Sequence, residues 1–258
     1  MDAYPFDLVL AVIVASVTIF LGFLPAKTIR SGLFAREAFK ATAAWIVVAA
    51  ISPLSVMHYP FILAVLCFVA WWNFQRDETF TGKIWLSLAS GLGISIGVMV
   101  IIAVTPGSLP TSGSSPAQAW DWGQAWCLAS LYLGGAIIGL AYVGYVLCRE
   151  ASVQPGIGGF IQNCLGLLFN LTLIRGVVLL IEIVTIPGAP GDLHGKDVRH
   201  VDFIFLPVGV CVFLILPVLA WLARRAAHFS SRLQPTRLLL AMILVGFVTE
   251  ILARTKLL

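Results

Sequence analysis

Hydrophobic residues occur along this chain in eight long runs that are separated by short polar segments. The runs cover residues 6–25, 38–57, 59–75, 83–105, 123–148, 160–187, 202–223 and 237–254. A helix needs about 20 consecutive apolar residues to cross the hydrocarbon core of a bilayer. The pattern therefore predicts an all-α, polytopic integral membrane bundle of about eight transmembrane helices, with residues 1–258 forming a single membrane domain.

The boundary between the second and third runs is the least distinct. Only a short segment around His58, Tyr59 and Pro60 separates them. A proline cannot continue the hydrogen-bond ladder of a helix, so Pro60 favours two helices that are joined by a tight turn. The alternative is one kinked span with an interfacial piece, which would reduce the number of spans to seven.

The composition supports a membrane protein. The chain is 60% hydrophobic and 11% charged, with a mean hydropathy of +0.99, whereas soluble domains carry about 25% charged residues. The net charge of +4 does not indicate a nucleic-acid partner, because the basic residues lie in short loops between apolar runs. The five cysteines form no CxxC pair, which favours packing roles over a disulfide framework.

The distribution of basic residues predicts the orientation of the spans. If the N-terminus lies outside, the inner loops hold Lys27, Arg30, Arg36, Lys40, Arg76, Lys83, Arg149, Arg224, Arg225, Arg232 and Arg237. The outer segments hold only Lys196, Arg199, Arg254 and Lys256. The positive-inside rule then places both termini on the outer, non-cytoplasmic side of the membrane.

Three ionisable residues lie inside the predicted spans: Arg175, Glu182 and Glu250. Arg175 and Glu182 are seven residues apart, so they share one helix face at a separation of about 10 Å along the axis. Glu250 precedes Arg254 by four residues, a spacing that allows an ion pair within the helix. These groups either fix helix packing or serve as catalytic groups, because a desolvated carboxyl group can donate, accept or relay a proton.

Asn163 and Asn170 form a second polar stripe on the sixth span, on a different face from Arg175. Such amides usually form hydrogen bonds between membrane helices, and Asn170 is also a candidate for substrate binding. The pairs Gly93–Gly97 and Gly135–Gly139 have the GxxxG spacing that lets two helix backbones approach closely.

Most other polar candidates lie on the predicted outer face. Trp122 is either an interfacial anchor or a residue that stacks on a substrate. His194 and His200 lie in the polar segment 188–202 together with Asp192, Asp197 and Asp202. This segment is either a solvated loop or a site for a phosphate-bearing headgroup or a metal, whose identity stays unknown because the spacing matches no strong metal-binding motif.

These candidates lead to three hypotheses for the function. The first is a membrane-embedded enzyme that acts on an isoprenoid or lipid, with Glu182, Glu250 and Arg175 as catalytic residues and Asn170, His194, His200 and Trp122 as substrate-binding residues. The second is a non-catalytic anchor or assembly subunit with membrane-protein partners or as a homo-oligomer. The third is a proton-coupled transporter, which the lack of a visible internal repeat argues against. No cofactor motif appears, and the sequence does not distinguish a bacterial inner membrane from an organelle membrane.

Overall fold

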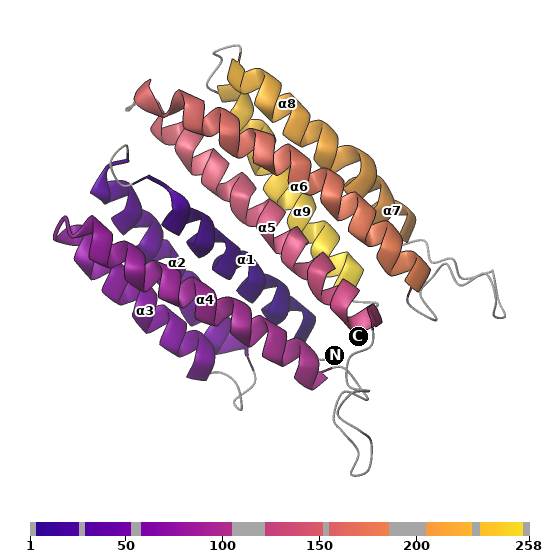
Figure 1. Ribbon diagram of the computed structural model, residues 1–258, viewed down its shortest axis with the longest axis horizontal. Coiled ribbons are helices and arrows are strands. Elements are labelled where there is room, and N and C mark those ends of the chain that lie inside the picture. Colours follow the sequence, from indigo (N-terminus) through magenta and orange to yellow (C-terminus); the bar gives the residue numbers. More distant parts are fainter. Residues whose placement is uncertain are drawn as a thin grey trace, which may run out of the picture.

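The computed structural model describes residues 4–25, 29–52, 58–104, 122–151, 155–185, 205–228 and 233–254. These residues confirm the all-α fold, because nearly all of them lie in helices (Figure 1). The helices are α1 (Tyr4–Phe23), α2 (Ser31–Ile51), α3 (His58–Gln75), α4 (Thr79–Val104), α5 (Trp122–Glu150), η2 (Pro155–Ile157), α6 (Gly158–Thr185), α7 (Phe205–Val210), the π-helix η4 (Cys211–Ile215), α8 (Leu216–His228) and α9 (Leu233–Arg254).

Prolines mark several of these boundaries. Pro5, Pro60 and Pro235 lie in the first turns of α1, α3 and α9, where the missing amide hydrogen breaks no hydrogen bond within the helix. Pro217 lies instead in the interior of the seventh hydrophobic run, directly after the π-helix η4. A proline there removes one bond of the ladder, and the wider π turn accommodates it.

α2 and α3 are separate helices that pack against each other, which excludes a single kinked span at this point. Polar contacts join the helix ends on this side of the first half. Ser31 Oγ donates a hydrogen bond to Asp77 Oδ1 in the α3–α4 turn, over 2.5 Å, and Lys83 Nζ donates one to the backbone oxygen of Leu24. Asp77 has a φ of 59°, a left-handed conformation that aspartate tolerates better than most residues.

The helices form two similar halves. In the first half, α1 packs on α2, α2 on α3, α3 on α4 and α4 on α1. In the second half, α5 packs on α6, α6 on α8, α8 on α9 and α9 on α5. Each half is therefore a closed ring of four helical rods, and the π-helix joins α7 to α8 within one rod.

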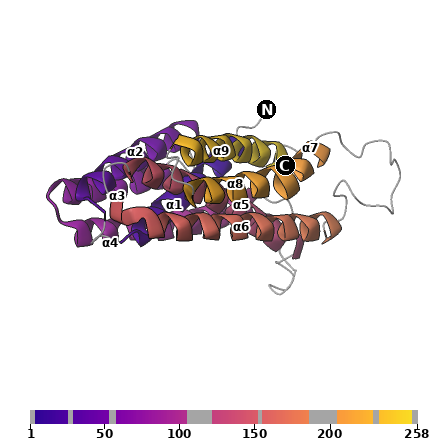
Figure 2. The same cartoon turned by 90° about the horizontal axis from the view of Figure 1, so that it is seen from above.

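The two halves are related by an approximate two-fold rotation about an axis parallel to the helices. α1 and α5 contact each other at the centre, and α3 and α8 lie at opposite edges of the molecule in Figure 1. Figure 2 shows α2 and α9 along one face and α4 and α6 along the other. This arrangement pairs α1 with α5, α2 with α6, α3 with α8 and α4 with α9. The hydrophobic pattern alone does not reveal it.

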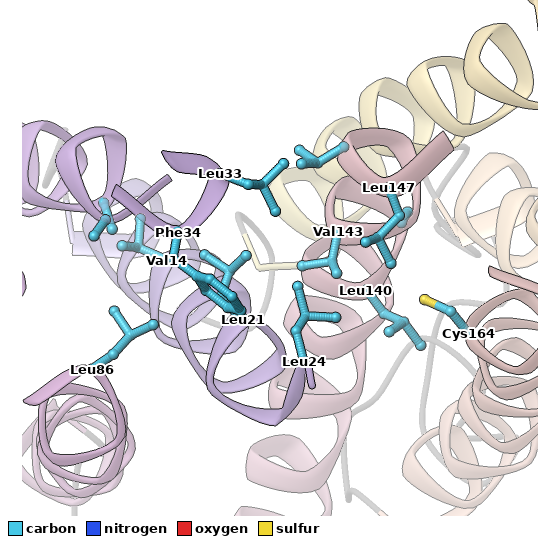
Figure 3. Packing of buried hydrophobic residues seen from close by; sticks show 14 of the residues in the cluster. Val14, Leu21, Leu24, Leu33, Phe34, Leu86, Leu140, Val143, Leu147 and Cys164 are labelled. Carbon is cyan, nitrogen blue, oxygen red and sulfur yellow. The ribbon is translucent and has the colours of Figure 1, made fainter. Parts of the chain in front are cut away.

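Small residues bring the two halves into close contact. A Cβ atom at Gly139 of α5 would lie 2.8 Å from Ser16 Cβ and 3.0 Å from the Ser16 carbonyl carbon on α1. Gly135 approaches Val12 of the same helix in a similar way. The Gly135–Gly139 pair therefore packs within the chain, along the seam between the halves. One buried hydrophobic cluster continues through both halves. Figure 3 shows part of it, with Leu21 and Leu24 from the first half and Val143 from the second.

Four helical segments among the described residues are long and apolar enough to cross a membrane: Ala129–Glu150, Gly158–Ile181, Val208–His228 and Gln234–Ala253. Large apolar side chains are also exposed on the outer surfaces of α2, α3, α4, α6, α8 and α9. Soluble monomers rarely expose apolar surface on this scale. Both observations indicate a membrane protein.

Candidate functional site in the second helical half

The core of the second half contains a buried ion pair between Arg175 of α6 and Glu250 of α9. Arg175 Nη2 lies 3.2 Å from Glu250 Oε1, and Arg175 Nε lies 3.3 Å from the same oxygen. The exposed fractions are 1% for Arg175 and 4% for Glu250. Charged side chains are costly to bury unless they are paired. Arg175 and Glu250 reduce this cost because each is the ion-pair partner of the other.

Three helices create the space for this pair. α6 and α9 are opposite corners of the second ring, so their side chains meet across its interior. Gly134 of α5 faces the same point, and a Cβ atom there would overlap the carboxyl group of Glu250. Arg175 and Glu250 each lie 17 residues after the first residue of their helix, which corresponds to about 26 Å along each helix axis. Glu250 lies four residues before the last residue of α9, so the pair is close to that end of α9.

The core of the first half contains a buried tryptophan. Trp45 of α2 is buried and packs toward α4, where a Cβ atom at Gly93 would lie 3.3 Å from Trp45 Cζ2 and 3.1 Å from Ala15 Cβ of α1. An indole ring thus lies inside the first ring, whereas an arginine and a glutamate lie inside the second. The two halves share an architecture but differ in the chemistry of their cores.

An apolar pocket of about 280 Å³ lies at the surface of the second half. It is formed by α9 together with α7 and the start of the π-helix, and its lining residues include Val208, Cys211, Leu244, Val248, Thr249 and Leu252. Leu244 and Val248 are also exposed on the surface, so the pocket opens outward. Successive helical residues point about 100° apart, so Glu250 projects from a different face of α9 than Leu244, Val248 and Leu252.

A second polar cluster lies between α2 and α5, at the end of the bundle where α2 begins and α5 ends. The carboxyl group of Glu37 is 1% exposed and accepts hydrogen bonds from Lys40 Nζ at 2.9 Å, from Arg36 Nε at 3.1 Å and from the Tyr142 hydroxyl at 2.7 Å. Arg36 also lies 3.7 Å from Glu150. Because Tyr142 and Glu150 belong to α5, this cluster links the two halves.

The structure brings together two of the residues that the sequence grouped as one site, Arg175 and Glu250. The side chain of Arg254, which the spacing suggested as a neighbour of Glu250, is outside the described part of the structure. Asn170 is exposed on the outer surface of α6 and does not face the ion pair. Glu182 and Trp122 lie near the outer ends of α6 and α5, but their side chains are outside the described part of the structure. His194 and His200 lie outside the described residues altogether.

Sequence reasoning missed Glu37 and Tyr142. Glu37 precedes the second hydrophobic run by one residue, so it was assigned to an inner loop, whereas α2 begins six residues earlier, at Ser31. The available signal was local: Lys40 lies three residues after Glu37, which is the spacing of neighbours on one helix face.

The described residues offer proton-transfer and charge-pairing chemistry. Glu250 and Glu37 are the buried carboxyl groups among them. Within the described ranges, no group of three histidine, cysteine, aspartate or glutamate side chains could hold a metal ion, and the predicted segment 188–202 lies outside those ranges. No protein family, curated protein or solved structure matches this chain.

Proposed function

We propose that the chain crosses the bilayer eight times, with both termini on the outer side. Tyr4 and Arg254 lie at the same end of the bundle (Figure 1), which supports an even number of crossings. The opposite end carries Arg30, Arg36, Lys40, Arg76, Arg149 and Arg225, as the positive-inside rule requires for the cytoplasmic face. Arg76 stacks 4.8 Å from the Trp72 ring and Arg225 5.2 Å from the Trp221 ring, a combination suited to a membrane interface.

Reporter fusions test this orientation. Alkaline phosphatase, which is active only outside the cytoplasm, is fused after residue 258 and, in a second chain, after residue 151. The proposal expects activity from the first fusion alone. Activity from the second fusion alone would reverse the orientation, and activity from both or neither would contradict an eight-span topology.

We propose that the protein is a membrane-embedded enzyme that acts on an isoprenoid or another lipid by carboxyl acid–base chemistry near the outer face. The observations that support this function are the buried Arg175–Glu250 pair and, on another face of α9, an apolar pocket that opens to the surface. The pocket suits a hydrocarbon chain, because ligand sites are mostly apolar with a few polar groups. The π-helix at its wall is a further indication, since π turns are frequent at functional sites.

In this proposal Glu250 transfers the proton and Arg175 holds the Glu250 carboxyl group in place. Arg175 also stabilises negative charge on the substrate, because a guanidinium group binds carboxylates and phosphates well. Glu182 lies two turns beyond Arg175 on α6 and supplies a second carboxyl group toward the outer end. The hydrocarbon chain of the substrate occupies the pocket between α9 and η4.

Substrate trapping tests this function. The full chain and the variants Glu250→Gln and Thr249→Trp are extracted gently, and bound molecules are identified by native mass spectrometry. The Gln variant should retain a lipophilic substrate that the unmodified chain has converted, and the Trp variant should lose it because the indole fills the pocket. The same ordinary bilayer phospholipids on all three chains would contradict an enzyme. Stoichiometric partner proteins would instead support an anchor or assembly subunit.

A proton-coupled transporter is the second candidate, because the two halves have the parallel two-fold relationship that some transporters use. Their seam carries ionisable groups at its inner end, where Glu37 contacts Tyr142. Reconstituted vesicles distinguish the two candidates. A carrier acidifies or alkalises the lumen when its substrate is added, and Glu250→Gln abolishes the signal, whereas an enzyme converts substrate in open membrane fragments without any gradient.

A further inference from the structure

The outward surface of α6 carries a polar stripe at a depth where lipid would otherwise surround it. Asn163 and Asn170 are both exposed, and they alternate with exposed apolar residues at Leu167, Ile174 and Val177. Asn170 lies 12 residues after Gly158, the first residue of α6, which is about 18 Å along a helix of about 42 Å. It therefore lies near the middle of the bilayer.

Neither asparagine has a hydrogen-bond partner within the described residues. Hydrocarbon offers none either, and an amide without a partner in an apolar medium is costly. Polar side chains inside membranes usually form hydrogen bonds between helices. The helices that pack on α6 are α5 and α8 with its π-helical extension, and Asn170 does not lie on the buried side of α6. The described part of this chain therefore offers these amides no partner helix.

The spacing of the stripe indicates what kind of partner fits it. The exposed positions 163, 167, 170, 174 and 177 are separated alternately by four and three residues, which is the spacing of a coiled-coil seam. In a parallel pair of identical helices, each position on such a seam meets its own counterpart. An asparagine amide is both a donor and an acceptor, so two identical amides pair across a two-fold axis.

We propose that two copies of this chain associate in the membrane through α6, with Asn163 and Asn170 each bonded to the same residue of the other copy. Leu167, Ile174 and Val177 pack between them. The two copies have the same orientation in the membrane, and the axis that relates them is parallel to the helices. Figure 2 shows α6 along one face of the molecule, so the second copy reaches it without displacing a helix. This interface is independent of the chemistry proposed for Glu250.

Single-molecule photobleaching in lipid bilayers tests this interface. The fluorescently labelled full chain is reconstituted over a wide range of protein-to-lipid ratios, and the fraction of dimers is counted. We expect the Asn163→Leu/Asn170→Leu double variant to associate roughly tenfold more weakly than the unmodified chain, because membrane hydrogen bonds of this kind have modest free energies. Leucine is stable against lipid, so this variant keeps its fold. The matched control is Val65→Ala on the exposed face of α3, which should dimerise normally.

Cross-linking locates the contact. Asn170→Cys should form an oxidised dimer, whereas Val65→Cys should not exceed the background of the parent chain with its five cysteines. A chain that stays monomeric at every protein-to-lipid ratio would overturn the proposal. Dimerisation that is equally strong in the double leucine variant would also overturn it. Cross-linking through Val65→Cys would overturn it as well. Capture of a different membrane protein by the Asn170 face, with no self-association, would also contradict it.

Discussion

The carboxyl group of Glu250 occupies the space that a side chain at Gly134 would need. Gly134→Ala should therefore lower the free energy of unfolding by about 1–3 kcal/mol, the usual cost of adding a methyl group to a packed core. Gly91→Ala is the matched control in α4, because nothing lies within 4 Å of a Cβ atom there. That control should be neutral or slightly stabilising. Thermal unfolding in mild detergent compares the two, and equal effects would mean that Glu250 does not occupy this space.

The buried Arg175–Glu250 pair predicts strongly non-additive substitutions. Arg175→Met or Glu250→Leu alone should destabilise the protein by about 3–5 kcal/mol, because each leaves an unpaired charge in the core. The double variant should recover most of this loss, since two apolar side chains then replace the pair. The free energy of unfolding is measured in lipid bicelles for the unmodified chain, the two single variants and the double variant, which completes a double-mutant cycle. Additive losses would show that the two residues do not interact.

The seam between the halves predicts a difference between two glycines of α5. Gly139→Ala should destabilise the protein by about 1–3 kcal/mol, because the new methyl group would meet both the side chain and the backbone of Ser16. Gly144→Ala should be tolerated, since its nearest contact is Leu239 Cδ1 at 3.5 Å and alanine favours a helix over glycine by about 1 kcal/mol. Limited proteolysis and thermal unfolding measure both variants. A tolerated Gly139→Ala would be inconsistent with the close approach of α1 and α5.

The inner polar cluster predicts a difference between two tyrosines. Tyr142→Phe removes a hydroxyl group that donates to the buried Glu37 carboxyl group at 2.7 Å, and hydrogen bonds to charged groups contribute about 1.5–3 kcal/mol. Tyr145→Phe is the control, one turn away on the same helix. We expect only Tyr142→Phe to lower the free energy of unfolding. If the two variants are equally stable, the contact between Tyr142 and Glu37 does not stabilise the packing of the two halves.

The sequence predicted the helical class and the approximate helix positions, because hydrophobic runs report where a chain contacts apolar surroundings. It was less accurate at the ends of helices. The seventh run ends at residue 223, before Arg224 and Arg225, yet α8 continues to His228. α2 likewise starts at Ser31, seven residues before its hydrophobic run. Hydropathy marks the edge of the apolar region, whereas the backbone ladder extends beyond it.

The candidate site was only partly predictable. Arg175 and Glu250 stand out because each is a charge inside an apolar run, but spacing rules apply within one helix and suggested Arg254 as a neighbour. The contact between Arg175 and Glu250 crosses between helices that are distant in sequence, so it depends on packing. The two-fold relationship was hidden for a similar reason. The cores of the two halves hold different residues, Trp45 in one and Arg175 with Glu250 in the other, although the helices around them have the same arrangement.

The closed ring of the first half has a consequence for how the protein is made. α1, α2, α3 and α4 pack on one another, so they can leave the translocon as an assembled unit while α5 is still being synthesised. The contacts that await the second half lie along α1, where Val12 and Ser16 meet Gly135 and Gly139, and at the inner end of α2. Each ring can thus form from its own helices, and contact between the two rings is what buries Gly135 and Gly139.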